Sequence, residues 1–163
     1  MAFKRTHERR TPFSSTVDLA NFTPMIASAK HLVFHGTVVL LFGLLLGAPY
    51  GKAINRGAPA HIVNSWRVAH QSLPIAAILM FSIAALLPSF SVSSTISWVI
   101  SGCFVVSSYF FCVSMPLAAI TGHRGLTRGK TMRENIVLFA NIVGAWLALI
   151  AALALVYAAA VSL

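Results

Sequence analysis

Residues 31–50, HLVFHGTVVLLFGLLLGAPY, decide the fold, because they form a long apolar stretch with no Lys, Arg, Asp or Glu. A helix crosses the hydrocarbon core of a bilayer with about 20 mainly apolar residues. Three further long apolar stretches follow, at residues 65–87, which have a polar opening with Arg67, and at residues 94–120 and 135–161. The sequence therefore predicts an all-α protein, an integral membrane bundle of four transmembrane helices.

The composition argues against a soluble domain. Of the 163 residues, 58% are hydrophobic and only 9% are charged, whereas soluble domains carry about a quarter charged residues. The net charge of +9 is typical of proteins that bind nucleic acid, but its distribution is not. Apart from Arg67, every Lys and Arg lies in the N-terminal tail or in two short loops, where such charges set membrane orientation or contact anionic lipid. We therefore expect the lipid bilayer, and no nucleic acid, as a partner.

We divide the chain into a polar, basic tail at residues 1–30 and a transmembrane domain at residues 31–163. Pro12 and Pro24 interrupt any regular helix in the tail, so we expect it to be disordered or to lie on the membrane surface. It lacks the compact apolar core and small-residue cleavage site of a signal peptide.

Basic residues near the helix ends predict the orientation. The loop after the first span carries Lys52 and Arg56, and the loop after the third span carries four basic residues between positions 124 and 133. On the opposite side, only Lys30 is close to a span. Because positive charge near helix ends favours the cytoplasmic side, we place the first and third loops in the cytoplasm and both termini outside.

Polar side chains within the spans are the candidate site residues, because they are costly in a membrane. His31 and His35 are one helical turn apart and therefore share a face of the first span. His70 lies about one turn into the second span, close in sequence to Arg67, Gln71 and Ser72. The remaining candidates are Cys103, Ser107, Ser108, Tyr109 and Cys112 in the third span and Asn141 in the fourth.

No span contains a carboxylate in its interior, since Glu8, Asp18 and Glu134 lie outside the spans or at an edge. This disfavours a transporter built on a buried acid, a paired-carboxylate hydrolase and a hard-cation site. Cys103 and Cys112 are nine residues apart, on opposite faces of one helix, so they cannot pair. We interpret them as small apolar fillers. The sequence also lacks Cys-x-x-Cys-His, which disfavours covalent attachment of a c-type haem.

Imidazole is the main group that remains for chemistry. A histidine inside a membrane without nearby acids holds a haem or metal, or makes structural hydrogen bonds between helices. Both interpretations stay open for His70, whereas the structural one is favoured for His31 and His35.

Small residues line one face of the first and last spans. Gly43 and Gly47 form a Gly-xxx-Gly pair, and Ala140, Gly144 and Ala148 form a stripe. Such residues let helix backbones approach closely. The sequence leaves open whether they pack within one chain or between chains.

Several segments resemble one known family, the bacterial styrene oxide isomerases. Residues 66–70, WRVAH, resemble its Trp-Ala-Arg-Ala-His segment, with the Arg shifted by one place. Residues 87–89, LPS, resemble the end of its second helix, and residues 124–127, RGLT, resemble its loop before the last helix. These three segments align without a gap. His31 and residues 40–43, LLFG, are similar to its first helix, so that the resemblance covers most of residues 31 to 130.

The resemblance implies a homotrimer of four-helix subunits in the bacterial inner (cytoplasmic) membrane, with haem b at the subunit interfaces. The family's axial histidine falls on His70. Arg67 is a candidate partner for a haem propionate, and an equally good alternative is that its side chain extends to a lipid phosphate. The implied reaction is a Meinwald rearrangement, in which a small hydrophobic aryl epoxide becomes an aldehyde. Ferric iron then acts as a Lewis acid on the epoxide oxygen, the benzylic C–O bond opens, and a hydride shifts to give the carbonyl.

Two positions depart from the family pattern. Ala76 stands where the family has an asparagine that faces the substrate, and Met115 stands where it has its active-site tyrosine. Tyr109 is the nearest phenol, but six residues earlier it points from a different face of the helix. The sequence therefore assigns no catalytic side chain and does not identify the epoxide.

Three classes of function remain from the sequence. The first is the haem-dependent epoxide isomerase. The second is a b-type haem protein that carries electrons or senses a ligand, in which a histidine of the first span supplies a second axial ligand. The third is a structural or transport protein without haem, whose histidines only bridge helices.

Overall fold

The computed structural model describes residues 25–163, which form four long helical segments and, in that part of the chain, no strand. The helices are α1 (Ala27–Leu45), α2 (Gly47–Asn55), α3 (Ala60–Leu86), α4 (Ser94–Thr121) and α5 (Met132–Val161), with a short 3-10 turn η2 (Leu87–Ser89) between α3 and α4. Four segments are long and apolar enough to cross a membrane, with α1 and α2 together forming the first. The predicted all-α bundle of four spans is confirmed, and the protein is a multi-pass membrane protein.

The first span is divided where the sequence predicted one continuous helix. Leu46 separates α1 from α2, and Pro49 follows as the third residue of α2. Proline is tolerated in the first turn of a helix, because the N–H that it lacks has no partner there. The first span also begins at Ala27, so Lys30 lies in the helix rather than in the tail. The prediction for the rest of the tail falls on residues 1–24, outside the described residues.

The other spans end at recognisable signals. Thr131 and Glu134 form a capping box at the start of α5, an arrangement in which side chains satisfy the free N–H groups of the first turn. Ser93 accepts a hydrogen bond from the backbone of Ile96 at the start of α4. Gly122 ends α4 with a φ of 70°, a left-handed conformation that glycine adopts without steric cost.

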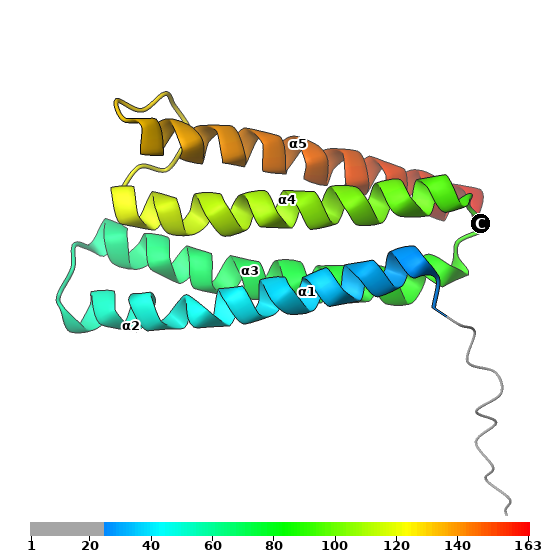
Figure 1. Ribbon diagram of the computed structural model, residues 1–163, viewed down its shortest axis with the longest axis horizontal. Helices are drawn as coiled ribbons and strands as arrows, with labels where there is room; N and C mark the ends of the chain where they lie inside the picture. Colours follow the sequence, from blue (N-terminus) through cyan, green and yellow to red (C-terminus); the bar gives the residue numbers. More distant parts are fainter. Residues whose placement is uncertain (1–24) are drawn as a thin grey trace, which may run out of the picture.

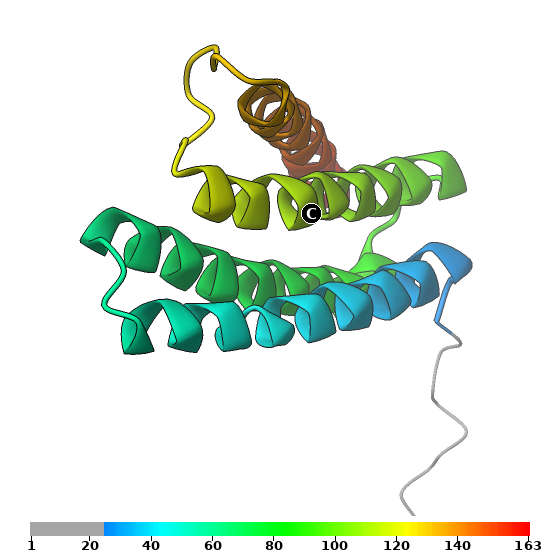
Figure 2. The ribbon, with the colours of Figure 1, turned by 60° about the vertical axis from the view of Figure 1, so that its left-hand side comes forward.

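The four spans pack as two pairs, α1 with α3 and α4 with α5. The pairs meet where α4 contacts both α1 and α3. Figure 1 shows the spans side by side, and Figure 2 shows that α5 is inclined to the other three. Leu32, Leu73 and Ile100 are fully buried between them. Large apolar side chains such as Phe34 and Ile75 are exposed on the outer faces, as expected where lipid rather than water surrounds the bundle.

The small-residue faces are used within this chain. A Cβ added at Gly43 would lie 2.6 Å from Cδ of Pro74, and one at Gly144 would lie 3.2 Å from the ring of Phe111. Only glycine therefore allows α1 to approach α3, and α5 to approach α4, this closely. The Ser107 hydroxyl adds a hydrogen bond of 2.7 Å to the carbonyl of Gly144.

The two ends of the bundle differ in charge. The α2–α3 and α4–α5 connections lie at one end, which we name the loop end. The start of α1, the α3–α4 connection and the C-terminus lie at the other, which we name the terminal end. Lys52, Arg56 and the four basic residues between positions 124 and 133 are all at the loop end. In residues 25–163, the terminal end carries only Lys30, so the charge asymmetry that predicted the orientation is present in the fold.

Candidate functional site

His70 is the best-positioned candidate ligand in the described part of the chain. Its Nδ1 atom lies 2.9 Å from the backbone oxygen of Gly43, across the interface between α3 and α1. A carbonyl oxygen can only accept, so Nδ1 carries the proton and donates it. The Nε2 atom of the neutral imidazole then keeps a free lone pair. A carbonyl that fixes the tautomer and orients the ring in this way is the usual support of a metal-ligating histidine.

The junction of α1 and α2 shapes the space around the ring. Gly47, the first residue of α2, lies so close that an added Cβ would be 3.1 Å from Cε1 of His70. Tyr50 stacks beside the imidazole, with ring centroids 6.1 Å apart and an angle of 27° between the planes. Gly43, Gly47 and Tyr50 are spaced by four and three residues, so they lie on one face of the first span and together contact the candidate ligand.

Arg67 lies one turn before His70 on α3, and its side chain is exposed. Its guanidinium donates to Oδ1 of Asn64 at 2.6 Å. Both side chains of this hydrogen bond are on the outside of α3, so the cation is accessible to an anionic group of a bound molecule. Gln71 is exposed and Ser72 is half-buried, and neither makes a side-chain hydrogen bond in residues 25–163.

The histidines of the first span lie apart from His70. The His70 ring contacts α1 at Gly43, which is eight residues, or about 12 Å along a helix, beyond His35. Nδ1 of His35 instead forms a hydrogen bond of 2.9 Å with the hydroxyl of Tyr109 on α4. Among residues 25–163, no second histidine lies beside His70, whereas the alternative of an electron carrier with two axial histidines requires one within the subunit.

A pocket of about 400 Å³ lies between α3, α4 and the α4–α5 connection, close to the loop end. We name it the α3–α5 pocket. Met115 and Val68 contribute apolar walls, and Arg124 and Asn141 contribute polar ones. Asn141 is tied to the connection, since its Nδ2 donates to the carbonyl of Arg124 at 3.3 Å.

Ser114 is a residue of this pocket that sequence reasoning missed. It lines the α3–α5 pocket, it is fully buried, and its hydroxyl has no hydrogen-bond partner among the described residues. The sequence did contain a sign of this residue, because Ser114 is a polar side chain directly before Met115 in an otherwise apolar stretch. A buried hydroxyl without a partner is unfavourable, so Ser114 is a natural contact for a polar atom of a molecule in this pocket.

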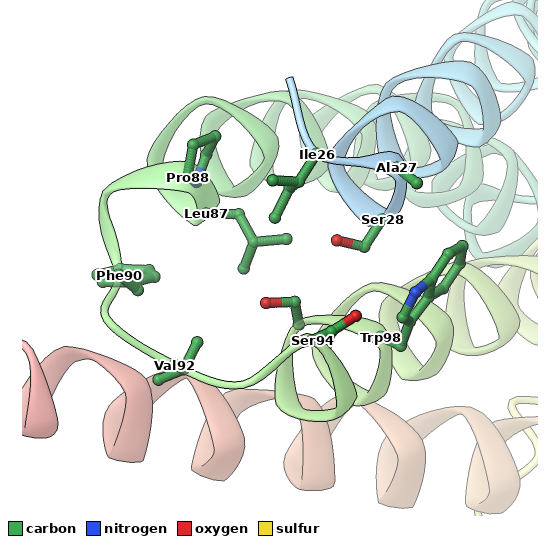
Figure 3. Close-up of a pocket in the computed structure, with 10 residues that line it drawn as sticks. Ile26, Ala27, Ser28, Leu87, Pro88, Phe90, Val92, Ser94 and Trp98 are labelled. Atoms are coloured by element: carbon green, nitrogen blue, oxygen red, sulfur yellow. The ribbon is translucent and has the colours of Figure 1, made fainter. Parts of the chain in front are cut away.

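Other cavities lie away from His70. Figure 3 shows one of about 300 Å³ at the terminal end, where Trp98 and Ser94 of α4 face Ser28 at the start of α1. A second, of about 290 Å³, lies between α4 and α5 and is lined by apolar residues and Tyr109. Neither contains the residues that the sequence predicted as ligands of a cofactor.

The remaining candidate side chains pack between helices and do not converge on a common site. Cys103 and Cys112 are both free and half-buried, in agreement with the prediction that they do not pair. Ser108 is buried and directs its hydroxyl to Sδ of Met80 at 3.4 Å. Within residues 25–163, no three His, Cys, Asp or Glu side chains converge as metal ligands. A haem needs less from the protein, since a single axial histidine holds its iron.

Comparison with known proteins agrees with this arrangement. A search of curated proteins found no match. The family model described as styrene oxide isomerase matches residues 28–160, a range that includes all four spans and both His70 and Met115. The chain therefore belongs to the styrene oxide isomerase family.

Proposed function

We propose that this protein is a haem b-dependent isomerase of the bacterial inner membrane, which converts an aryl epoxide to an aldehyde by a Meinwald rearrangement. The observation that carries the proposal is His70, whose Nδ1 is held by the carbonyl of Gly43 in a chain of the styrene oxide isomerase family. The family name indicates isomerisation of an epoxide, and the imidazole is the group that suits the cofactor.

The residues around His70 fit an axial ligand of a haem. The Gly43 carbonyl accepts the hydrogen bond from Nδ1, which leaves Nε2 as the ligating nitrogen, and Gly47 places no side chain against the Cε1 edge of the ring. Arg67 is exposed one turn away and is suited to pair with a propionate, because a guanidinium binds carboxylates through two parallel hydrogen bonds. When bound, ferric haem supplies a Lewis acid for the epoxide oxygen.

The apolar spans suit this reaction because it consumes no proton and no external electrons. The hydride moves between two carbons of the substrate, so the chain needs to supply neither a general base nor a redox partner. The protein instead excludes water, which would trap the cationic carbon as a diol. In the α3–α5 pocket, Met115, Val68 and Ala118 provide apolar walls for the aryl ring.

The polar contact to the epoxide differs from that of the family. Met115 replaces the tyrosine and lines the α3–α5 pocket, and the adjacent Ser114 lines the same pocket and has a buried hydroxyl without a partner among the described residues. We assign to Ser114 the hydrogen bond to the substrate oxygen that the phenol makes in relatives. A hydroxyl in this place is shorter than a phenol, so the pocket has room for an epoxide larger than styrene oxide.

The direct test is turnover by the detergent-purified, haem-loaded protein. Styrene oxide and its ring-extended analogues are supplied without nicotinamide or flavin, and the aldehyde is measured by gas chromatography. We expect the unaltered protein to form aldehyde. The rate should fall at least tenfold in Ser114→Ala, and no aldehyde should form in His70→Ala. Haem-loaded protein that converts none of these epoxides would contradict the proposed reaction while leaving the haem site in place.

A further inference from the structure

The terminal end of the bundle contains a second histidine cluster that the proposed reaction does not use. His31 and His35 lie on one face of α1, with ring centroids 6.1 Å apart and an angle of only 20° between the planes. Both line a cavity of about 110 Å³ between α1 and α4, together with Trp98 and Ser101. His31 packs against Trp98 at a centroid distance of 5.3 Å, so both imidazoles face α4.

The hydrogen bond of His35 leaves one of its ring nitrogens free. Nδ1 lies 2.9 Å from the Tyr109 hydroxyl, and Nε2 has no partner among residues 25–163. A neighbouring group that holds one ring nitrogen is the usual support of a metal-ligating histidine. When the Tyr109 hydroxyl accepts this hydrogen bond from Nδ1, Nε2 of His35 keeps the lone pair that a metal ion needs.

The spacing of the two rings suits one metal ion. Imidazole nitrogens bind zinc at about 2.1 Å, which places the centroids of two ligating rings roughly 5 Å apart. The observed separation is 6.1 Å, and small rotations about the side-chain torsions of His31 and His35 close the difference. Histidines one turn apart are a recurring metal-binding pair on a helix.

An independent feature of the same cavity points to a bound polar species. Ser101 lines it, is 1% exposed, and its hydroxyl has no partner among the described residues. Gly102, Val105 and Val106 make the rest of the lining apolar, so a water molecule is held in this cavity only by Ser101, Trp98 and the two imidazoles. A metal-bound water is a suitable partner for Ser101, because the two histidines leave coordination positions open.

We propose that His31 and His35 form a binding site for one divalent late-transition metal ion, completed by water and oriented by Tyr109. Imidazole ligands suit Cu²⁺, Ni²⁺ and Zn²⁺, with Cu²⁺ bound most tightly. Ca²⁺ and Mg²⁺ are excluded, since they need oxygen ligands and no carboxylate lines this cavity. The site is separate from His70 and does not depend on the proposed function.

The test is a titration of the detergent-purified protein, prepared without a polyhistidine tag, with CuSO₄ and separately with ZnSO₄. Electron paramagnetic resonance of the Cu²⁺ form should show coupling to two imidazole nitrogens, with one ion per chain. We expect His31→Ala and His35→Ala each to weaken binding at least 30-fold, and Tyr109→Phe to weaken it about tenfold by releasing the His35 ring. A helical circular dichroism spectrum and an elution volume in detergent equal to those of the unaltered protein show that the fold of each variant is intact.

Matched controls are available in the same chain. His61 is exposed and His123 is half-buried at the loop end, and His61→Ala and His123→Ala should leave the Cu²⁺ affinity unchanged. His70→Ala should also leave it unchanged, which separates this site from the haem site. Binding that persists in the His31→Ala, His35→Ala double variant, or that is lost in either loop-end variant, would overturn the proposal. An unaltered affinity in Tyr109→Phe would overturn the role of Tyr109.

Discussion

At the scale of single residues, His70 and His35 each make one hydrogen bond to another helix through the imidazole ring. In both, Nδ1 is engaged by a group on a neighbouring helix, the Gly43 carbonyl for His70 and the Tyr109 hydroxyl for His35. A buried polar group without a partner is costly in a membrane, so the engaged nitrogen also stabilises helix packing. The same hydrogen bond therefore serves the fold and leaves Nε2 for chemistry.

A residue-scale prediction concerns the position where the family has its tyrosine. Met115 lines the α3–α5 pocket, so Met115→Tyr returns a phenol to that wall. A well-placed hydrogen-bond donor to a developing oxyanion contributes about 10²-fold or more to turnover. We expect Met115→Tyr to raise kcat/KM for styrene oxide at least tenfold, measured as aldehyde formed per haem.

Met115→Phe is the matched control, because it has the same ring without the hydroxyl. It should leave kcat/KM for styrene oxide within about threefold of the unaltered protein. Equal gains in Met115→Tyr and Met115→Phe would show that pocket shape, and not the hydrogen bond, limits the reaction.

At the scale of helices, the contact of α1 with α3 determines where His70 lies. Gly43 faces Pro74 and Leu73 of α3 so closely that an added Cβ would lie 2.6 Å and 2.9 Å from their side chains. The carbonyl of the same Gly43 holds His70. Packing and ligand orientation therefore depend on one position of α1.

We predict that Gly43→Ala destabilises the bundle by about 2 kcal/mol, because overpacking forces the two helices apart. The melting temperature of the detergent-solubilised protein should fall, and the haem should be retained less well. Gly102→Ala in α4 is the control, since an added Cβ there meets nothing within 4 Å, and it should leave both quantities unchanged. Equal melting temperatures for the two variants would contradict this role of Gly43.

The helices could be predicted from sequence because the need to satisfy backbone groups in lipid leaves few alternatives. Residues 94–120 were predicted as the third span, and the structure has Ser94–Thr121. The second span was predicted to start at residue 65, whereas α3 begins at Ala60. Its first turns, which contain His61 and Asn64, are too polar to be recognised by hydropathy alone.

The surroundings of the site were less predictable. His70 was found because an imidazole in an apolar stretch is unusual, but its partner Gly43 is 27 residues away in sequence. Nothing local to either residue indicates the contact. The break at Leu46 was likewise missed, because residues 31–50 are apolar throughout and Pro49 alone does not show whether a helix kinks or restarts. Such features depend on how α1 packs on α3.

At the scale of the whole molecule, charge is concentrated at one end of a bundle whose other surfaces are apolar. The α2–α3 and α4–α5 connections share the loop end and carry most of the basic residues of the described chain. Positive charge near helix ends favours the cytoplasmic side. This arrangement supports cytoplasmic placement of the loop end and an external C-terminus.

Cysteine labelling in intact cells tests this orientation. In a background in which Cys103 and Cys112 are replaced by Ala, we expect Ser91→Cys, in the α3–α4 connection, to react with a membrane-impermeant maleimide. Thr127→Cys, in the α4–α5 connection, should react only after the cells are opened. The reverse pattern would place the loop end outside.

The optical spectrum of the detergent-purified protein, expressed with ample haem supply, tests the central claim most directly. The account predicts a ferric b-type haem, one per chain, whose Soret band shifts on addition of an epoxide or of imidazole, because Nε2 of His70 fills only one axial position. His70→Ala should lose this haem, whereas His61→Ala should retain it. Absence of haem from the unaltered protein, or full retention in His70→Ala, would contradict the account.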